Sequence, residues 1–330
     1  MRESRRSSIL VAPIAGVSTL LSLVGVGLAL IAWSRTRVMH NLPLTAALSG
    51  QLVRFQGRRT GGLAYYQAGA PKRGVPPLVL LHSINAAASS FEMKPLFDHY
   101  ARQRRVIALD LPGYGFSDRA DREYTPALFR DAILDLVEHL GSEPVDAAAL
   151  SLSSEFLALA AHAQPQRFRT LTFISPTGFS KRNAQLRPNE ALLRLLRFSL
   201  WRRPIYDLLT SRPSLRLFLS ANLRRPLDRS LVDYAYLTSH QPNAEFAPLY
   251  FLSLKLFTPT IFQVYRQLTQ PCLLIYGRDP FVGYAYADEL RKKQNWRIVA
   301  LENAGALTHW DNPEAVIAQM DALSKRCQDV

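Results

Sequence analysis

The sequence predicts an α/β fold: a mostly parallel, doubly wound sheet with a helical cap insertion and an N-terminal transmembrane helix. Three observations support this prediction. Short apolar runs alternate with helical periodicity from residue 77 onwards, this alternation is interrupted over residues 178–269, and a long uncharged segment lies near the start of the chain. Continuous apolar runs are typical of strands that are buried on both faces of a parallel sheet.

The expected elements follow one another in a regular order after an initial hairpin. Alternating strands and helices imply a parallel sheet with helices on both faces, and sites in such sheets lie beyond the carboxyl ends of the strands. His82, Ser151 and Asp279 all stand at such ends. The expected strands cover residues 51–55, 63–67, 77–82, 105–111, 145–150, 168–174, 271–276 and 296–301, and the expected helices cover 91–102, 125–140, 155–163, 284–294 and 313–325.

The stretch from residue 178 to residue 269 is rich in Leu, Arg, aromatic residues and Pro, and it predicts several short helices that form a lid. It carries 14 Lys or Arg against 5 Asp or Glu. Within it, ALLRLLRFSLWRR (191–203) combines a wide apolar surface with arginines. Such a segment suits either a helix at an anionic membrane surface or a lid helix packed on the domain with solvated arginines, and both readings stay open.

Ile9–Trp33 is a run of 25 residues without a charge. At 1.5 Å per residue it reaches about 37 Å, enough to cross a hydrocarbon core of roughly 30 Å with tilt. The run predicts an uncleaved, single-pass signal anchor, with a fully buried core helix as the alternative. Arginines on both sides leave the side of the membrane open. The expected organisation is an anchor and linker over residues 1–50 and one domain over 51–330.

The formal net charge of +14 raises the question of a nucleic-acid partner, but no motif of that class accompanies it. An anionic membrane surface is the partner that the sequence favours. Two cysteines, Cys272 and Cys327, make neither a disulfide framework nor a metal site. The sequence predicts no metal and no cofactor.

Ser151 stands between an apolar run and a helical run, within Ala149-Leu150-Ser151-Leu152-Ser153. A serine on a sharp strand-to-helix turn can hold its hydroxyl at the N-terminal end of the helix, where negative charge is favoured. The usual form of this turn is G-x-S-x-G; here both outer positions are small, but neither is glycine. Taken alone, the segment fits either a nucleophile or an ordinary serine cap that follows a buried strand.

Five ordered blocks resemble the α/β-hydrolase family over residues 51–326. RVIALDLPGYGFSD (105–118) is very similar to a block found in many members, and ALSLSS (149–154) stands where the nucleophile turn belongs. The other three are LVLLHS (78–83), LLIYGRDPFV (273–282) and AGALTHWDNPEAV (304–316). The resemblance implies an α/β-hydrolase fold with a cap after the sixth strand, and acyl transfer to a serine.

The resemblance implies a triad in the order Ser151, Asp279 and His309. A hydroxyl needs an adjacent base that a carboxylate orients, because it is a poor nucleophile near neutral pH. The oxyanion would be held by the backbone N–H groups of Leu152 and Ile84. His82, Ser83 and Asn85 would support the loop that carries the second donor, and the expected substrate is a small or lipid-like ester.

The histidine loop departs from the family pattern. Members commonly read Gly-His-x-x-His, whereas Gly305-Ala306-Leu307-Thr308-His309 puts alanine at the catalytic position. Three explanations stay open: His309 reaches Ser151 through a remodelled loop, another group such as His82 substitutes, or the site has lost its base. The main hypothesis is a membrane-anchored, esterase-like or lipase-like hydrolase. The alternative is a catalytically impaired member that binds a lipid or a protein at the membrane.

Overall fold

A computed structural model describes the backbone of residues 11–327 and the side chains of residues 24–327. Eight strands form one sheet in the order β1-β2-β4-β3-β5-β6-β7-β8. β1 and β2 form the predicted hairpin, β2 is antiparallel to β4, and every other pair is parallel. The mostly parallel α/β sheet is therefore confirmed. The strands are β1 Gln51–Gly57, β2 Gly61–Ala68, β3 Leu78–Leu81, β4 Val106–Asp110, β5 Val145–Leu150, β6 Phe168–Ile174, β7 Cys272–Tyr276 and β8 Trp296–Ala300.

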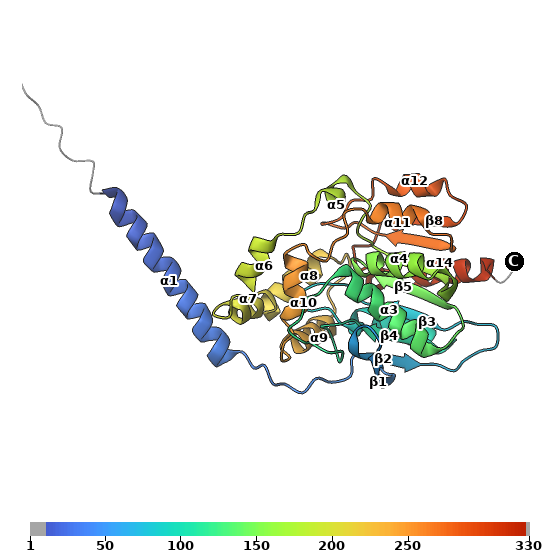
Figure 1. The fold of residues 1–330 in the computed structure, drawn as a ribbon, viewed down its shortest axis with the longest axis horizontal. Coiled ribbons are helices and arrows are strands. Elements are labelled where there is room, and N and C mark those ends of the chain that lie inside the picture. Colours follow the sequence, from blue (N-terminus) through green and yellow to red (C-terminus); the bar gives the residue numbers. More distant parts are fainter. Residues whose placement is uncertain (1–10, 328–330) are drawn as a thin grey trace, which may run out of the picture.

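Helices cover both faces of the sheet (Figure 1). α3 and α4 pack against one another on one face, while α2 and α14 lie on the other. Thr125 caps α3 by accepting a hydrogen bond from the Leu128 N–H at 3.2 Å, with Pro126 in the first turn. The elements are η1 Ser90–Met93, α2 Lys94–Tyr100, α3 Pro126–Leu140, α4 Ser153–Ala163, η2 Pro165–Arg167, α12 Ala287–Arg291, α13 Thr308–Asp311 and α14 Pro313–Arg326.

The core divides into two clusters because successive side chains of a strand point to opposite faces. In β3, Val79 and Leu81 join the cluster beneath α3 and α4, whereas Leu78 and Leu80 join the cluster beneath α2 and α14. All four are buried. Burial on both faces explains why the sequence of these strands is continuously apolar rather than alternating.

Seven helices lie between β6 and β7, in the stretch where the sequence predicts a helical insertion. The expected single helix over residues 191–203 is instead two helices. α6 ends at Leu196 and α7 begins at Arg202. In one continuous helix the ring of Pro204 would clash with the carbonyl group of Leu200, whereas in the first turn of a new helix it is tolerated. The cap helices are α5 Lys181–Gln185, α6 Glu190–Leu196, α7 Arg202–Leu209, α8 Arg212–Ala221, α9 Arg229–Ser239, α10 Phe246–Leu252 and α11 Ile261–Gln267.

α1 (Val11–Arg37) leaves the molecule beside the cap (Figure 1). Within the described part of the chain, no helix has the length and apolarity that crossing a membrane requires. Residues 9 and 10 of the expected span, and the side chains of residues 11–23, lie outside the described part. Val24, Val26 and Leu28 are 52%, 67% and 62% exposed. These exposures exclude the alternative of a fully buried core helix for this part of α1.

Candidate active site

Ser151 occupies a strained turn between β5 and α4. Its φ is +54°, a left-handed conformation that non-glycine residues rarely adopt, at a penalty on the order of 1–3 kcal/mol. The turn is held by a 2.9 Å hydrogen bond from the Ser151 N–H to the Ile174 carbonyl oxygen of β6. Ala149 and Ser153 are both fully buried, so the two small residues occupy crowded positions on either side of the serine. This geometry distinguishes Ser151 from an ordinary helix cap, because an N-cap residue has extended backbone angles.

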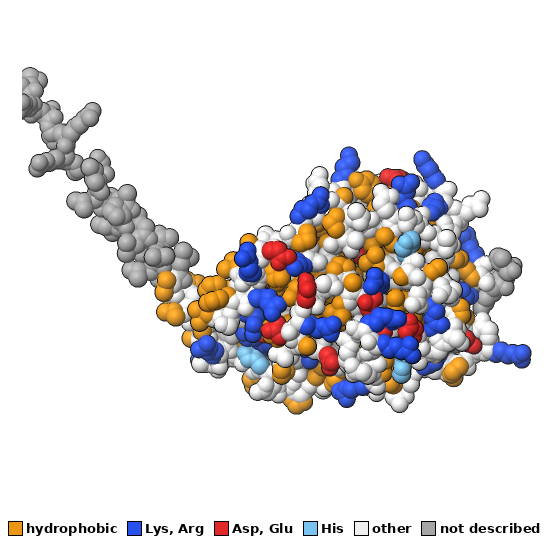
Figure 2. Space-filling view, viewed as in Figure 1, with side chains coloured by type: hydrophobic (Ala, Val, Ile, Leu, Met, Phe, Trp, Pro, Cys, Tyr) orange, Lys and Arg blue, Asp and Glu red, His pale blue; other side chains and the backbone are white. Residues whose placement is uncertain are grey.

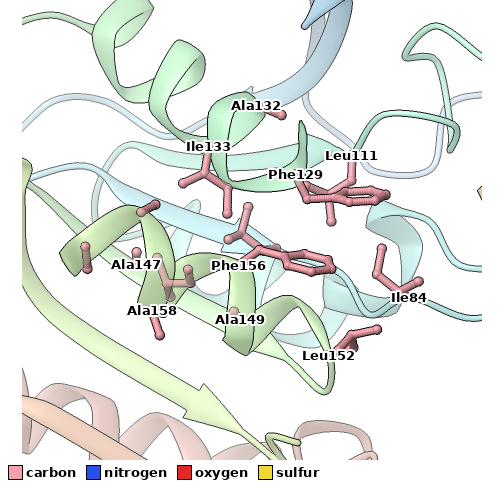
Figure 3. Close-up of a cluster of buried hydrophobic side chains, with 14 of the residues drawn as sticks. Ile84, Leu111, Phe129, Ala132, Ile133, Ala147, Ala149, Leu152, Phe156 and Ala158 are labelled. Carbon is pink, nitrogen blue, oxygen red and sulfur yellow. The ribbon is translucent and has the colours of Figure 1, made fainter. Parts of the chain in front are cut away.

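The two expected oxyanion donors lie at the same cavity as Ser151. Among the described residues, neither the Leu152 N–H nor the Ile84 N–H has a hydrogen-bond acceptor. Both side chains belong to one buried cluster, in which Phe129 and Phe156 stack with ring centroids 4.7 Å apart (Figure 3). Core packing therefore fixes the backbone from which both N–H groups project. Free N–H groups at a cavity can stabilise negative charge on a carbonyl oxygen.

His82 supports the loop that follows β3. Its Nδ1 donates to the Ser83 carbonyl oxygen at 2.6 Å, and its Nε2 accepts from the Leu111 N–H at 3.0 Å. Both ring nitrogens are thus occupied, and complete burial lowers the pKa of His82. Ser153 joins this loop to the nucleophile turn because its hydroxyl donates to the His82 carbonyl oxygen at 2.5 Å. In this geometry neither ring nitrogen of His82 is free to accept a proton from Ser151.

Glu92 is a member of the cavity wall that the sequence did not single out. Its carboxylate accepts the Ser83 N–H and the Asn85 amide, each at 2.8 Å. Asn85 also donates to the Ser83 hydroxyl. Ser83 stands where the family usually has glycine, and Glu92 and Asn85 together hold it in place. An acidic residue within the apolar segment SFEMKPLF was the available signal. Glu92 therefore brings a negative charge close to the expected oxyanion donors.

Asp279 follows β7 and lines the same cavity as Ser151. Its Oδ1 accepts the N–H groups of Phe281 and Val282 at 2.7 and 3.0 Å. Burial raises the pKa of Asp279. The Arg278 N–H donates to the Ala304 carbonyl oxygen at 2.8 Å, which joins the Asp279 loop to the loop that follows β8. The acid thus lies beside the segment that would carry the base.

His309 does not reach Ser151. It is fully buried in α13, and its Nε2 donates to the Glu92 carbonyl oxygen at 2.7 Å. Its Nδ1 is buried without a partner among the described residues, and burial lowers the pKa of His309 to about 4. His309 is absent from the residues that line the cavity. The expectation that a remodelled loop brings its ring to Ser151 is not met, because α13 directs the ring towards η1.

Ala306, at the position where the family pattern commonly has histidine, lies on the cavity wall. The loop around it is tightly fixed: the Gly305 N–H donates to an Asp311 carboxylate oxygen at 2.6 Å, and the Leu307 N–H donates to the Asn222 carbonyl oxygen at 3.0 Å. A side chain at position 305 would collide with that Asn222 carbonyl group. No histidine is found among the described residues that line the cavity.

The cavity has a volume of about 390 Å³, within the usual range for small-molecule sites. Much of its wall is apolar. Ser175, which the sequence did not single out, has a φ of +44° at the end of β6 and a buried hydroxyl without a described partner. Among the described residues, no group of three His, Cys, Asp or Glu could hold a metal ion. The apolar residues of the cavity wall include Leu150, Leu186, Phe218, Leu219, Phe251, Leu254, Phe257, Phe281 and Val282.

Comparison with known proteins identifies the fold family. The model of the alpha/beta hydrolase family matches residues 78–319. The chain belongs to this family.

Two curated relatives match shorter stretches: the dihydrolipoyllysine-residue acetyltransferase component of the acetoin cleaving system of Pseudomonas putida, and 2-hydroxymuconate semialdehyde hydrolase of Pseudomonas sp. (strain CF600). The first is 30% identical over 42% of this chain and 34% of its own length. The second is 27% identical over 32% of this chain and 38% of its own length. The matched part of the chain thus spans little more than a third of either relative.

Solved structures extend the likeness over nearly the whole chain. A membrane phospholipase A has a TM-score of 0.61 and 20% identity, covering 96% of this chain and 99% of its own. A carboxylesterase from Bacillus subtilis has a TM-score of 0.62 and 19% identity, covering 90% and 97%. At these identities the likeness establishes the fold, and the chemistry has to be argued from the cavity.

Proposed function

We propose that this alpha/beta hydrolase acts slowly on apolar esters, with Ser151 as the nucleophile in a site that lacks a histidine base. The observation that carries the proposal is the shared cavity of Ser151, Asp279 and Ala306. The strained turn at Ser151 supports nucleophilic attack, and the N–H groups of Leu152 and Ile84, which have no acceptor among the described residues, support charge stabilisation. Family members normally place an imidazole between the serine and the acid, and the aligned position in this chain is Ala306.

The cavity wall supports a substrate with an apolar acyl or alcohol part. Phe218, Phe251, Phe257 and Phe281 all contribute to it. Apolar surface favours a hydrocarbon group, while the few polar groups near Ser151 would orient a carbonyl. The relatives named as a carboxylesterase and a phospholipase make an ester or a lipid ester the substrate class to test first.

Asp279 is the group that we propose accepts the proton from Ser151, through a water molecule in the space beside Ala306. The serine oxygen bonds to the carbonyl carbon, its proton passes to the carboxylate, and the leaving alcohol takes that proton as the carbon–oxygen bond breaks. Water then attacks the acyl-serine by the same route and releases the acid. Burial raises the pKa of Asp279, which makes it a stronger base than a free aspartate. An aligned histidine commonly contributes about 10²–10⁴-fold, so its loss predicts slow turnover.

A fluorophosphonate probe tests this proposal on the detergent-solubilised full-length chain. We expect slow labelling of the native protein and none of Ser151→Ala. Ser175→Ala is the matched control, because Ser175 also ends a strand with positive φ and lines the cavity. It should label at the native rate. Labelling that persists in Ser151→Ala would overturn the assignment of the nucleophile.

Binding without turnover is the second candidate function, and Glu92 favours it. Its carboxylate accepts hydrogen bonds in the loop that also provides the Ile84 N–H. A negative charge there opposes an oxyanion. This candidate gains if the native protein never labels but binds a fluorescent fatty-acid analogue that fills the cavity. It is excluded if the native protein turns over an ester and Ser151→Ala does not.

Single-pass membrane attachment is a further part of the proposal. It rests on the 25 uncharged residues Ile9–Trp33 and on the exposed apolar side chains of α1. Resistance to extraction by alkaline carbonate would support attachment, and release into the supernatant would contradict it. Protease protection in sealed vesicles would then show which side of the membrane carries the domain.

A further inference from the structure

The large apolar side chains that are exposed on this molecule are concentrated in one part of it. Among the described residues, every one of them lies on α1, in the linker after it, on the cap, or in the loop that follows β7. Seven of these twelve residues lie on α6, α7, α8 or the segment that joins α6 to α7, with Leu208 at 49% and Leu217 at 76% exposed. This part of the surface is called the face of α6, α7 and α8. Soluble surfaces scatter such residues singly, so their concentration on the cap indicates a contact surface.

α1 is joined to this same cap. Asp207 of α7 is fully buried and accepts the Ser34 hydroxyl at 2.6 Å and His40 Nε2 at 2.9 Å. Arg203 donates to it at 3.0 Å from the preceding turn of α7. One buried carboxylate therefore connects the end of α1, the linker and the cap. Figure 2 shows hydrophobic side chains gathered where α1 meets the molecule.

The charge of the cap suits an anionic surface. Residues 178–269 carry 14 Lys or Arg against 5 Asp or Glu, nine of the chain's excess of 14 positive charges. Two of these acids, Asp207 and Glu245, are buried in ion pairs with Arg202 and Arg203. Arg194 and Arg216, on α6 and α8, make no ion pair with a described residue. Arginines that flank apolar side chains can extend to lipid head groups while the apolar groups enter the acyl region.

The cavity opens towards apolar side chains of this kind. Phe218 of α8 and Phe281 of the Asp279 loop both line the cavity, and their rings stack with centroids 6.0 Å apart. Both remain exposed, at 40% and 54%. An exposed aromatic pair at the rim of an apolar cavity would be poorly solvated in water and well solvated by lipid.

We propose that the face of α6, α7 and α8 docks on an anionic lipid bilayer, and that the rim of Phe218 and Phe281 admits a lipid-derived substrate from it. The substrate part of this proposal rests on the proposed ester function; the docking part does not. A second copy of the chain and a protein partner are the alternative occupants of this face. The bilayer is favoured because α7 contacts α1, whose exposed side chains are also apolar, and because the exposed Arg194 and Arg216 lie on α6 and α8.

An environment-sensitive fluorophore on the full-length chain tests the docking. In a Cys327→Ser background, the fluorophore is placed at Leu208→Cys, or at Ser142→Cys as the matched exposed control, since Cys272 is buried. Ser142 lies between α3 and β5, before the amino end of β5, whereas the cavity lies beyond the carboxyl end of that strand. The protein is reconstituted into phosphatidylcholine vesicles, with and without phosphatidylglycerol, and with or without bromine on the acyl chains.

We expect the fluorophore at Leu208→Cys to shift to the blue and to be quenched by the brominated lipid, more strongly with phosphatidylglycerol, and the Ser142→Cys control to do neither. Arg194→Glu should weaken the dependence on phosphatidylglycerol, because it lowers the positive charge of the face. No quenching at position 208, or equal quenching at both positions, overturns the proposal. Excimer emission from pyrene at position 208 would assign the face to a second copy and would also overturn the proposal.

Fluorophosphonate labelling in detergent is independent of lipid, so a failure of docking can be distinguished from a failure of the proposed catalysis.

Discussion

Two loops meet at the cavity, and they differ in how much of a hydrolase site they retain. The turn at Ser151 has the left-handed backbone and the buried small neighbours that a nucleophile requires, and the Leu152 N–H has no acceptor in the described part of the chain. The loop from Ala304 to His309 has the position of a base loop, beside Asp279, without a base at the cavity. The difference teaches that the strained turn at Ser151 can be present although the second loop places no imidazole at the cavity.

The largest effect that we predict comes from returning an imidazole to the second loop. Ala306→His should raise the rate of fluorophosphonate labelling by about 10³-fold, within the range of general-base catalysis. The reason is that position 306 shares one cavity with Ser151 and Asp279. The measurement is the labelling rate of the native and variant proteins at neutral pH.

Two controls sharpen this first experiment. Ala306→His combined with Ser151→Ala should not label, and Ala306→Asn, which cannot accept a proton at neutral pH, should label at no more than the native rate. An unchanged rate in a folded Ala306→His protein would mean that the deficiency lies elsewhere in the cavity. The Glu92 carboxylate would then be the first suspect, because it accepts a hydrogen bond from the Ser83 N–H in the loop that carries the second oxyanion donor.

The second prediction concerns the buried histidine. Because burial lowers the pKa of His309 from 6.5 to about 4, the unfolded chain binds a proton between these pH values and the folded chain does not. Stability should therefore fall as the pH drops through this window, by up to about 3 kcal/mol. Above pH 6.5 the ring is neutral in both states and contributes no pH dependence.

Urea unfolding across the same pH range measures this effect. His309→Gln keeps a donor for the Glu92 carbonyl oxygen but cannot be protonated, so its stability should depend less on pH than that of the native protein. His162→Gln, at an exposed position, is the control and should retain the native dependence. An unchanged pH dependence in His309→Gln would show that the ring is accessible to water, and would reopen the possibility that it reaches the cavity.

A diffusible base provides the third prediction. Added imidazole should enter the space beside Ala306 and accelerate labelling of the native protein by about tenfold, a part of what an aligned base contributes. Ala306→Phe fills that space and should abolish the acceleration. Ser151→Ala excludes reaction of imidazole itself with the probe. Equal acceleration of the native protein and Ala306→Phe would argue against an empty base position.

The sequence predicted the strands well, because continuous apolar runs indicate strands buried on both faces. The small residues around Ser151 indicated a crowded turn, and the role of Ser151 as a nucleophile stays a prediction. The direction of the His309 ring could not be predicted, since its partner Glu92 lies 217 residues away in the chain. The interruption between α6 and α7 was available from Pro204, but the apolar periodicity of residues 191–203 outweighed it.

The smallest predicted effect tests how the intact turn is held. Ser153→Ala removes the hydroxyl that donates to the His82 carbonyl oxygen, and a buried acceptor that loses its partner costs about 1–3 kcal/mol. Ser154→Ala is the matched control, because Ser154 is also fully buried in the first turn of α4 but bonds within its own segment, to the Ala149 carbonyl oxygen at 3.1 Å. Both variants should lose stability in urea, but only Ser153→Ala should also slow labelling of Ser151, because only that hydroxyl joins the nucleophile turn to the loop of the second oxyanion donor. Equal labelling rates in the two variants would mean that the two loops keep their relative position through core packing alone.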